Sequence, residues 1–544
     1  MGELKSERAS WDSHYRELSE FLLPRNGRFT PTDRNKGGKE KFNKIYDNSG
    51  TRALGILAAG LMAGMTSPAR PWFALATPDP GLMEFAPVKR WLHQVTRLTR
   101  DIMARSNFYR TLHSQYKEMG AFGTAPAIVL PDFQNVIHTT PQTVGEYYLA
   151  TDYNGRVDTL AREYEMTVAQ MVREFGVENV SPTVKNLWDS GKGADSWVRV
   201  AHIIQPRDMR DLTRDDKRHM PWESCYYEPG CQKDKYLREG GFKEFPVLAP
   251  RWELAGGDIY GTSPGMEALG DIKQLQHQQL RKMQAIDMMA RPPIQAPSGA
   301  KNRAIDLLPG GVNYFDMAGN GAKASNLVDV RIDLSHLLAD IQDVRGRIRE
   351  AFYANLFMMI AEDDRSGITA REIAERHEEK LLMLGPVLER LHNELLSPAI
   401  DIIFFRIMDA GLLPPPPAEL QGVDLKVEFV SVLAQAQRAV GTQAVDRLLG
   451  TVAGIAQLKP EVIDKLDGDQ IIDAYSDMLG IDPNLIVADE NVAMIRQSRQ
   501  QQQQAMQAAQ AAQVAADSAA KLGTVNTGER NMATDLMSAL TGYT

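Results

Sequence analysis

The chain has 544 residues, of which 43% are hydrophobic and 24% charged, a composition typical of a folded globular protein and not of a disordered, collagen-like or membrane-embedded chain. Its formal net charge is −9, with 61 Lys and Arg against 70 Asp and Glu, which disfavours a protein that coats nucleic acid by neutralising phosphates. The only cysteines, Cys225 and Cys231, exclude a disulfide framework and a four-thiolate zinc site, and favour a reducing compartment.

The first 125 residues predict four helices, over residues 11–23, 44–65, 85–105 and 108–119, punctuated by prolines. The longest apolar stretch, residues 53–65, contains three glycines and is too short to span a bilayer. The start of the chain also lacks the apolar core of a secretory signal. We therefore expect a buried helix at residues 53–65 and no membrane partner.

From residue 125 to about 254 the hydrophobic period changes to that of strands, over residues 125–130, 146–167, 197–204, 222–228 and 242–248. Asn154-Gly155 lies between two β-rich runs and predicts a hairpin with a type I′ turn, whose central residues both need positive φ. One short helix, over residues 168–175, interrupts this region. The pattern predicts a mostly antiparallel β region.

Two helices with a single narrow apolar stripe follow. Ser263 is a good N-cap before Pro264, and the helix that it opens runs to Ala290 with Leu269, Ile272 and Leu275 on its stripe. A glycine-rich insert, residues 292–333, precedes a second helix at 334–359. The apolar stripe of this second helix includes Ile341, Val344 and Ile348. Because a single stripe cannot serve as a deep core element, the pair predicts a stalk.

The remainder of the chain is predicted to be largely helical. A polar loop at 361–367 precedes a capping box at Thr369–Glu372 that opens a long helix to Ala410. Pro386 and Pro398 must kink or break that helix twice. A half-buried strand is expected at 423–430, helices at 431–490, a Gln/Ala-rich helix to about residue 520, and disorder after it.

One motif suggests an enzyme. Residues 261–265 read Gly-Thr-Ser-Pro-Gly, which matches the nucleophile elbow of serine hydrolases with Ser263 as nucleophile. The oxyanion hole of that elbow uses the backbone N–H of the following residue, and Pro264 has none. A helix cap explains Ser263 better, and a cap predicts that aspartate could replace it.

Metal and nucleotide sites are also disfavoured. Cys225, Cys231 and His219 provide three possible zinc ligands, but a bend between paired strands through Pro229-Gly230 explains the cysteines better. Glu362, Asp363 and Asp364 could bind magnesium, although a solvated acidic loop is the simpler interpretation. No phosphate-binding loop of a motor ATPase is found. We expect no metal, no cofactor and no catalytic residue.

The order of elements resembles that of the portal, or head-to-tail connector, proteins of short-tailed double-stranded DNA bacteriophages. The segments that carry this resemblance, in chain order, are residues 61–75, 162–176, 251–276, 369–414 and 429–439. Each is weak alone, whereas the ordered set is specific. The Gln/Ala-rich region and the last twenty or so residues match the family only in composition.

The resemblance implies an α+β, mainly helical fold with a wing, stem, clip and crown that assembles as a ring, generally of twelve copies. The wing would be residues 1–255 with the long kinked helix and strand at 369–430. The rest would be stem helices at 256–291 and 334–360, a clip at 292–333, a tunnel loop at 361–368, a crown at 431–495, a barrel at 496–520 and a disordered tail at 521–544. Stem packing would use Leu269, Ile272, Leu275, Ile341, Val344 and Ile348.

The implied role is a non-enzymatic ring at one vertex of the capsid, made in the host cytoplasm, through which DNA is packaged and ejected. A terminase motor and then tail adaptor proteins would dock on it, and major capsid and scaffolding proteins would surround it. The residues that meet DNA would be those of the tunnel loop: Glu362, Asp363, Asp364, Arg365, Ser366 and Gly367. The alternatives are a monomeric helical scaffold or adaptor, and a serine hydrolase that uses Ser263.

Overall fold

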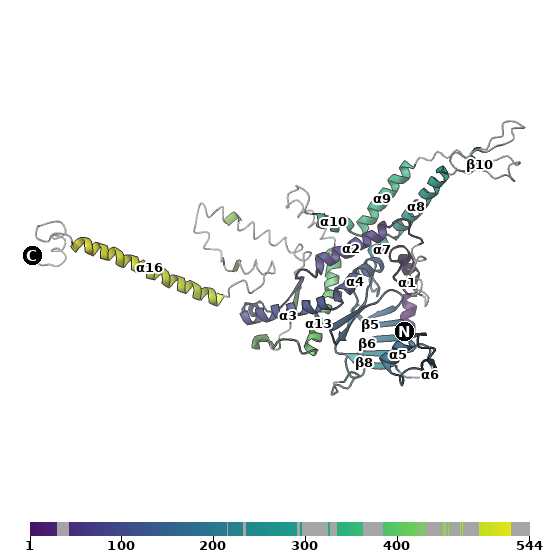
Figure 1. The fold of residues 1–544 in the computed structure, drawn as a ribbon, viewed down its shortest axis with the longest axis horizontal. Coiled ribbons are helices and arrows are strands. Elements are labelled where there is room, and N and C mark those ends of the chain that lie inside the picture. The colour runs from purple at the N-terminus through teal and green to yellow at the C-terminus, as the bar shows by residue number, and fades with distance from the viewer. Residues whose placement is uncertain are drawn as a thin grey trace, which may run out of the picture. The chain divides into compact units, whose positions relative to one another are not determined.

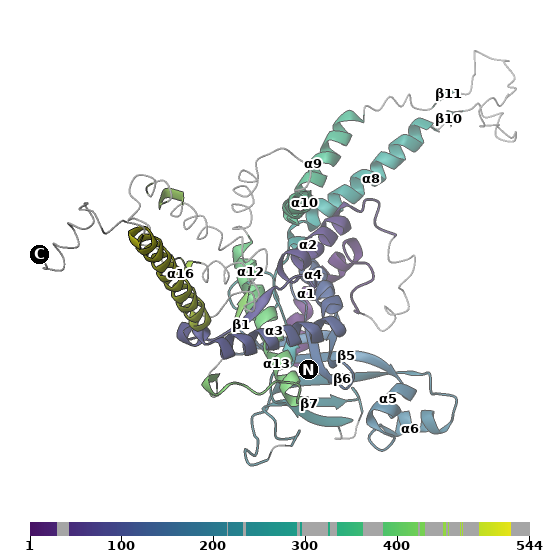
Figure 2. The ribbon, with the colours of Figure 1, turned by 60° about the vertical axis from the view of Figure 1, so that its left-hand side comes forward.

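A computed structural model describes residues 1–29, 43–214, 216–231, 236–290, 294–295, 325–326, 334–362, 384–420, 422, 425–429, 450–452, 455, 468, 470–471 and 489–523 (Figures 1 and 2). The chain divides into two compact units. The first contains residues 1–78 and 91–465, and the second contains 79–90 and 466–544. Helices together with antiparallel sheets confirm the expected α+β class.

The predicted N-terminal helices are all present. They are α1 (Gly2–Phe21), α2 (Ser49–Met65), α3 (Ala86–Arg105) and α4 (Phe108–Phe122), with a short 3₁₀ helix, η3 (Pro80–Glu84), before α3. Helix α2 packs against α4, α9 and α10, and this explains its high content of small apolar residues. At Gly60 a Cβ atom would lie 2.2 Å from the ring of Phe357, so α2 and α10 touch at a distance that only glycine allows.

The β region forms two antiparallel sheets, as predicted. The larger has the order β4-β5-β6-β7-β8, and the smaller β3-β2-β9. The strands are β2 (Ala127–Asp132), β3 (Val136–Pro141), β4 (Tyr147–Thr151), β5 (Val157–Thr167), β6 (Trp197–Pro206), β7 (Trp222–Tyr227), β8 (Arg238–Phe242) and β9 (Val247–Leu248). In the larger sheet each strand pairs antiparallel with the next strand along the chain, so the sheet is a simple meander.

The hairpin at Asn154-Gly155 is confirmed, but its predicted turn type is wrong. Gly155 has a φ of 76°, whereas Asn154 is not in the left-handed region. Asp152 sets the geometry, because its Oδ1 accepts hydrogen bonds from the backbone N–H groups of Asn154 (2.9 Å) and Arg156 (2.8 Å). The loop is therefore residues 153–155, a longer hairpin connection that ends in one left-handed glycine.

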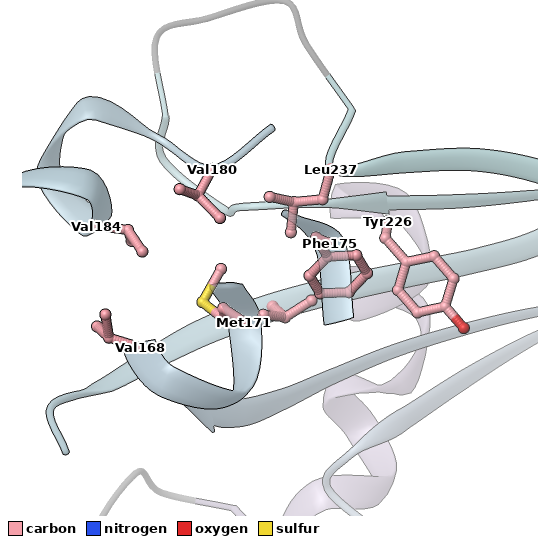
Figure 3. Packing of buried hydrophobic residues seen from close by; sticks show 8 residues of the cluster. Val168, Met171, Phe175, Val180, Val184, Tyr226 and Leu237 are labelled. Carbon is pink, nitrogen blue, oxygen red and sulfur yellow. The ribbon is translucent and has the colours of Figure 1, made fainter. Parts of the chain in front are cut away.

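Two short helices, α5 (Val168–Phe175) and α6 (Pro182–Asp189), cover one face of the larger sheet (Figure 3). The buried cluster between helices and sheet is Val168, Met171, Phe175, Val180, Val184, Val200, Tyr226 and Leu237. Helix α5 matches the prediction, and α6 was missed. Its signal was available, since Ser181 caps α6 by accepting a hydrogen bond from the N–H of Val184 and Pro182 follows at the first helical position.

The described part of the long helix predicted to Ala410 is helical from Gly385 to Asp409, with a π-helical irregularity just before Pro398 in place of a break. Helix α12 (Gly385–Leu391) has Pro386 in its first turn, and α13 (Ser397–Asp409) has Pro398 in its first turn. One π-helical stretch, His392–Leu396, joins them. Residues 369–383, including the predicted capping box, lie outside the described residues. After α13 a short 3₁₀ turn, η6 (Ala418–Leu420), leads to β12 (Lys426–Phe429), which pairs with β1 (Phe73–Ala76) and confirms the strand predicted at 423–430.

The π-helical turn is fixed to the β region by one ion pair. The side chain of Arg251 is only 3% exposed. Its guanidinium binds the carboxylate of Glu394 through Nε (3.1 Å) and Nη2 (2.7 Å). The Nη2 atom of Arg251 also donates to the carbonyl oxygen of Gly155, at 2.8 Å. One arginine thus joins the π-helical turn to the β4–β5 hairpin.

In the second unit, α16 (Asp489–Gly523) contains the whole predicted Gln/Ala-rich helix. Its large apolar residues are exposed in the single chain: Met494, Ile495, Met506 and Val514. Most of residues 431–488, and all of 524–544 where disorder is predicted, lie outside the described residues. No helix in the described parts of the chain is both long and apolar enough to cross a membrane.

Candidate functional site

The predicted stalk is a hairpin of two helices. Helix α8 (Leu269–Ala290) follows the single turn α7 (Pro264–Glu267), and α9 (Ser335–Ala351) returns beside it in both views (Figures 1 and 2). Between them, β10 (Ile294–Gln295) pairs with β11 (Ser325–Asn326), which is the described part of the insert predicted at 292–333. The rest of that insert lies outside the described residues.

The apolar stripe of this hairpin falls into two parts. The six predicted stem residues are at most 5% exposed: Leu269, Ile272, Leu275, Ile341, Val344 and Ile348. We call them the inner half. The apolar residues nearer to β10 and β11 are 39–52% exposed: Met283, Ile286, Met288, Met289 and Leu338. We call these the outer half. The predicted stripe continues into the outer half through Met283, Ile286 and Leu338, whereas Met288 and Met289 are further exposed apolar residues at the end of α8.

A buried carboxylate fastens the inner half to the segment before α2. Asp47 is 8% exposed, and its Oδ2 accepts hydrogen bonds from Arg345 on α9 (2.6 Å) and Gln279 on α8 (3.0 Å). Gln276 adds to this link, since its amide oxygen accepts from the backbone N–H of Asp47 (2.8 Å) and its amide nitrogen donates to the Asp47 carbonyl (2.8 Å). Three elements therefore meet at Asp47.

The charge state of Asp47 follows from these contacts. Burial by itself would raise its pKa, but hydrogen bonds from Ser49 and Arg345 outweigh that effect and hold the pKa below its ordinary value of 3.8. Sequence reasoning missed this cluster because Asp47 lies more than 200 residues from Gln276, Gln279 and Arg345 along the chain, and no local pattern connects them.

Polar contacts also join the two helices on the solvent side. Arg347 Nη1 on α9 lies 3.4 Å from Asp271 Oδ1 on α8. The Asp340 carboxylate accepts hydrogen bonds from the side-chain amides of Gln274 and Gln278. The glutamines that made α8 look unsuited to a core therefore bind its partner helix.

Ser263 is a helix cap, as predicted, and it has a second role. Its Oγ accepts a hydrogen bond from the N–H of Met266 (3.0 Å) and donates one to the carbonyl oxygen of Ala121 on α4 (2.8 Å), with the residue 1% exposed. A buried hydroxyl with both partners in place is not a free nucleophile. The bond to Ala121 argues against the expectation that aspartate could replace Ser263, because a carboxylate cannot donate to that carbonyl oxygen.

The glycines of the elbow-like motif have a packing role. A Cβ atom on Gly261 would lie 2.6 Å from the carbonyl oxygen of Gly123, and one on Gly123 would lie 2.0 Å from that of Gly261. Gly265 would meet the carbonyl of Ala121 at 2.9 Å. The Gly-Thr-Ser-Pro-Gly sequence therefore allows the start of the hairpin to lie directly against the backbone at the end of α4.

The second stem helix, predicted as continuous over 334–359, is broken. Helix α9 ends at Ala351 and α10 (Ala354–Glu362) begins after Tyr353, whose φ of 54° lies in the left-handed region. Phe352 is fully buried at the break. Burial of Phe352 and the contact of α10 with α2 compensate for the unfavourable backbone of Tyr353. A local apolar pattern carries no signal for such a break.

The predicted tunnel loop is largely beyond the described part of the chain. The backbone of Glu362 ends α10, and Asp363, Asp364, Arg365, Ser366 and Gly367 lie outside the described residues. The possible zinc ligands are described. Cys225 is buried in β7, and Cys231 follows the predicted bend, where Gly230 has a φ of 83°. Among the described residues, no three His, Cys, Asp or Glu side chains are placed to hold a metal ion.

A buried serine–histidine pair in the sheet also fails as a hydrolytic site. His202 Nε2 lies 2.9 Å from Ser224 Oγ, and Arg162 Nε donates to His202 Nδ1 at 3.1 Å. Burial, with the nearby arginines, holds the pKa of His202 well below its ordinary value. A triad needs a carboxylate where this chain has Arg162, and His202 is fully buried.

Comparison with known proteins decides the family. The family model described as bacteriophage head to tail connecting protein matches residues 1–487. The chain belongs to this family. A probable portal protein of Bordetella phage BPP-1 is 57% identical over 543 residues, covering 100% of this chain and 98% of the relative. The portal protein of Salmonella phage epsilon15 is 45% identical over 542 residues, covering 99% and 97%.

Two solved structures were also found by similarity of fold. One is a chain from the virion of a native gene transfer agent particle, with 11% identity and a TM-score of 0.35 over 80% of this chain and 90% of that chain. The other is from the neck of an empty gene transfer agent particle, with 13% identity and a TM-score of 0.38 over 84% and 96%.

Membership confirms the resemblance inferred from the sequence. A head to tail connecting protein is a structural part of the phage virion, not an enzyme, and the family implies a ring oligomer at the head–tail junction. Within the described residues of this connector protein, the outer half of the α8–α9 hairpin and α16 both carry large apolar side chains that stay exposed in the single chain.

Proposed function

We propose that this connector protein forms a ring, generally of twelve copies, whose axial channel conducts double-stranded DNA into and out of the capsid. The observation that carries this proposal is the outer half of the α8–α9 hairpin, whose five large apolar residues stay 39–52% exposed in the single chain. Apolar surface of this extent on paired helices is stabilised when neighbouring copies cover it.

The proposed division of labour follows the sequence-based boundaries. The hairpin is the stem, residues 292–333 are the clip where a terminase motor and later tail adaptor proteins dock, and α16 belongs to the barrel. Major capsid and scaffolding proteins surround the ring during assembly in the host cytoplasm. The exposed apolar residues of α16 support a role in contacts between copies.

Ring formation can be tested directly. Purified full-length protein is examined by negative-stain microscopy and by light scattering over a range of concentrations. We expect closed rings with a central hole, and fewer of them for Ile286→Asp, which places charge in the outer half. Lys185→Asp, on the exposed face of α6, is the control and keeps its rings. A monomer at all concentrations would favour the scaffold or adaptor alternative.

The predicted tunnel loop, Glu362 to Gly367, is the proposed contact with moving DNA. Arg365 is its only cation beside three carboxylates, and a single exposed ionic contact contributes only about 0–1 kcal/mol. Such a contact can steady DNA without stopping it. We expect Arg365→Ala to leave rings and capsids normal but to change the length or retention of packaged DNA. Full-length genomes at wild-type yield, also after replacement of Glu362 to Arg365 by Gly and Ser, would exclude the loop.

A further inference from the structure

Basic residues outnumber acidic ones outside the hairpin, along α3 and α4. Residues 91–122 contain five Arg and Lys but only two acidic residues, Asp101 and Glu118, in a chain whose net charge is −9. The basic residues are Arg97, Arg100, Arg105, Arg110 and Lys117, which we call the α3–α4 basic surface. A local excess of positive charge in a chain of net negative charge indicates a surface suited to a negatively charged partner.

The basic side chains face away from the core. The opposite side of α3 is buried through Leu92, Val95 and Met103. By contrast, Arg97, Arg105 and Arg110 are exposed, and Arg100 and Lys117 are half-buried. Helices α3 and α4, labelled in Figure 2, are joined only by Ser106 and Asn107. Arg105 at the end of α3 and Arg110 near the start of α4 are therefore five residues apart along the chain.

Within the described part of the chain, these five cations form no ion pair. Other surface cations do pair, for example Lys273 with Glu17 and Arg347 with Asp271. Glu118 does not neutralise the surface, because its side chain is buried and hydrogen-bonded to Asn26 and Thr143. Burial raises the pKa of Glu118 to about 7, which further weakens its charge at neutral pH.

The chemistry of this surface fits the phosphates of duplex DNA. Four of the five cations are arginines, whose planar fork binds phosphate through two hydrogen bonds. At about 1.5 Å per residue, Arg97 to Arg105 extends about 12 Å, and phosphates on one strand are about 3.4 Å apart along the axis. The surface therefore spans about three to four phosphates per strand.

Base recognition is not built into this surface. Tyr109 on α4 is engaged elsewhere, since its hydroxyl accepts a hydrogen bond from Trp72 Nε1 at 3.0 Å. Binding would then depend on charge and not on sequence. We propose that the α3–α4 basic surface binds the phosphate backbone of duplex DNA without sequence preference. It gives the connector a DNA contact on elements other than the proposed stem and tunnel loop.

The test measures DNA binding by purified full-length protein whose oligomeric state has been checked. A fluorescent 30-base-pair duplex is titrated at several NaCl concentrations with wild type and with the triple variant Arg97→Gln, Arg100→Gln, Arg105→Gln. The control variant, Arg173→Gln, Lys185→Gln, Lys192→Gln, removes the same charge from exposed, unpaired cations on and beside α5 and α6. Thermal unfolding verifies that both variants are folded.

We expect the α3 variant to lose about tenfold or more in affinity near 0.1 M NaCl, and its logarithmic salt slope to fall by about 2.7. The control should change affinity less than about twofold. Equal losses in both variants, or no binding by wild type, would overturn the proposal. If polyglutamate at matched charge displaces the duplex as well as unlabelled DNA does, the proposal is also overturned, and an acidic protein becomes the better candidate for the partner of this surface. If wild type forms rings but the α3 variant binds DNA as tightly as wild type, the result refutes the basic surface and leaves the proposed ring intact.

Discussion

The inner half of the α8–α9 hairpin is buried within the chain, whereas the outer half, built from the same helices, stays exposed. The inner half meets α2 and the Asp47 cluster, and its start is pressed against the end of α4. The outer half stays 39–52% exposed in the single chain. The comparison shows that one amphipathic pattern can serve folding at one end and, as proposed, assembly at the other.

The largest expected loss of stability comes from substitution of Ser263, which caps the start of the hairpin beside the inner half. Ser263→Asp places an unpaired charge at a buried site and removes the bond to Ala121, so we expect it to lower the free energy of unfolding by about 3–5 kcal/mol. Ser263→Ala loses the cap and that bond and should cost about 1–3 kcal/mol. Urea unfolding at fixed protein concentration measures both. An Asp variant as stable as wild type would show that the bond to Ala121 is unimportant.

A matched pair of truncations compares the halves directly. Ile272 is fully buried and its Cδ1 lies 3.1 Å from the Cβ position of Gly50 on α2, so Ile272→Ala should cost about 2–5 kcal/mol. Ile286 is 43% exposed, so Ile286→Ala should change the free energy of unfolding by no more than about 0.5 kcal/mol. Both are measured by unfolding at low protein concentration, where assembly contributes least. Similar losses at the two positions would remove the distinction.

The smallest effect is the pH dependence of the Asp47 cluster. Its pKa is lowered in the folded chain, so Asp47 contributes stability above its ordinary pKa of 3.8 and loses it as pH falls through the lower folded value. We expect Asp47→Asn to cost about 1–2 kcal/mol at pH 7 and less near pH 3. Asp340→Asn is the control, because Asp340 makes only exposed contacts on the solvent side of the hairpin, and we expect a change within about 0.5 kcal/mol. A pH-independent cost would contradict the lowered pKa.

Local signals in the sequence were sufficient for most elements. The cap at Ser263, the prolines of the long helix and the alternating strands each depend on residues close together in the sequence. The family was identified from several sequence segments that occur in the same order as in known members, which is a different signal from the local patterns that predict helices and strands. The expected hairpin turn failed in detail because Asp152 supplies a side-chain acceptor that competes with a type I′ turn.

Interactions between distant segments could not be predicted. Asp47 and Arg345 are 298 residues apart, and Arg251 and Glu394 are 143 apart. The break at Tyr353 depends on where α10 packs, and the division of the apolar stripe depends on the length over which α2 covers it. For the candidate site, the six stem residues were found as a pattern, but their burial within a single chain is a property of the tertiary fold.

The two kinds of glycine contact place different limits on how this sequence can diverge. Gly60 faces the ring of Phe357, so a relative with a smaller side chain at the position of Phe357 has room for alanine or serine at that of Gly60. The two positions should therefore change together. Gly123 and Gly261 face each other's backbone, which no substitution can shrink. Across related connectors that pair should stay glycine even where the surrounding helices have been rewritten.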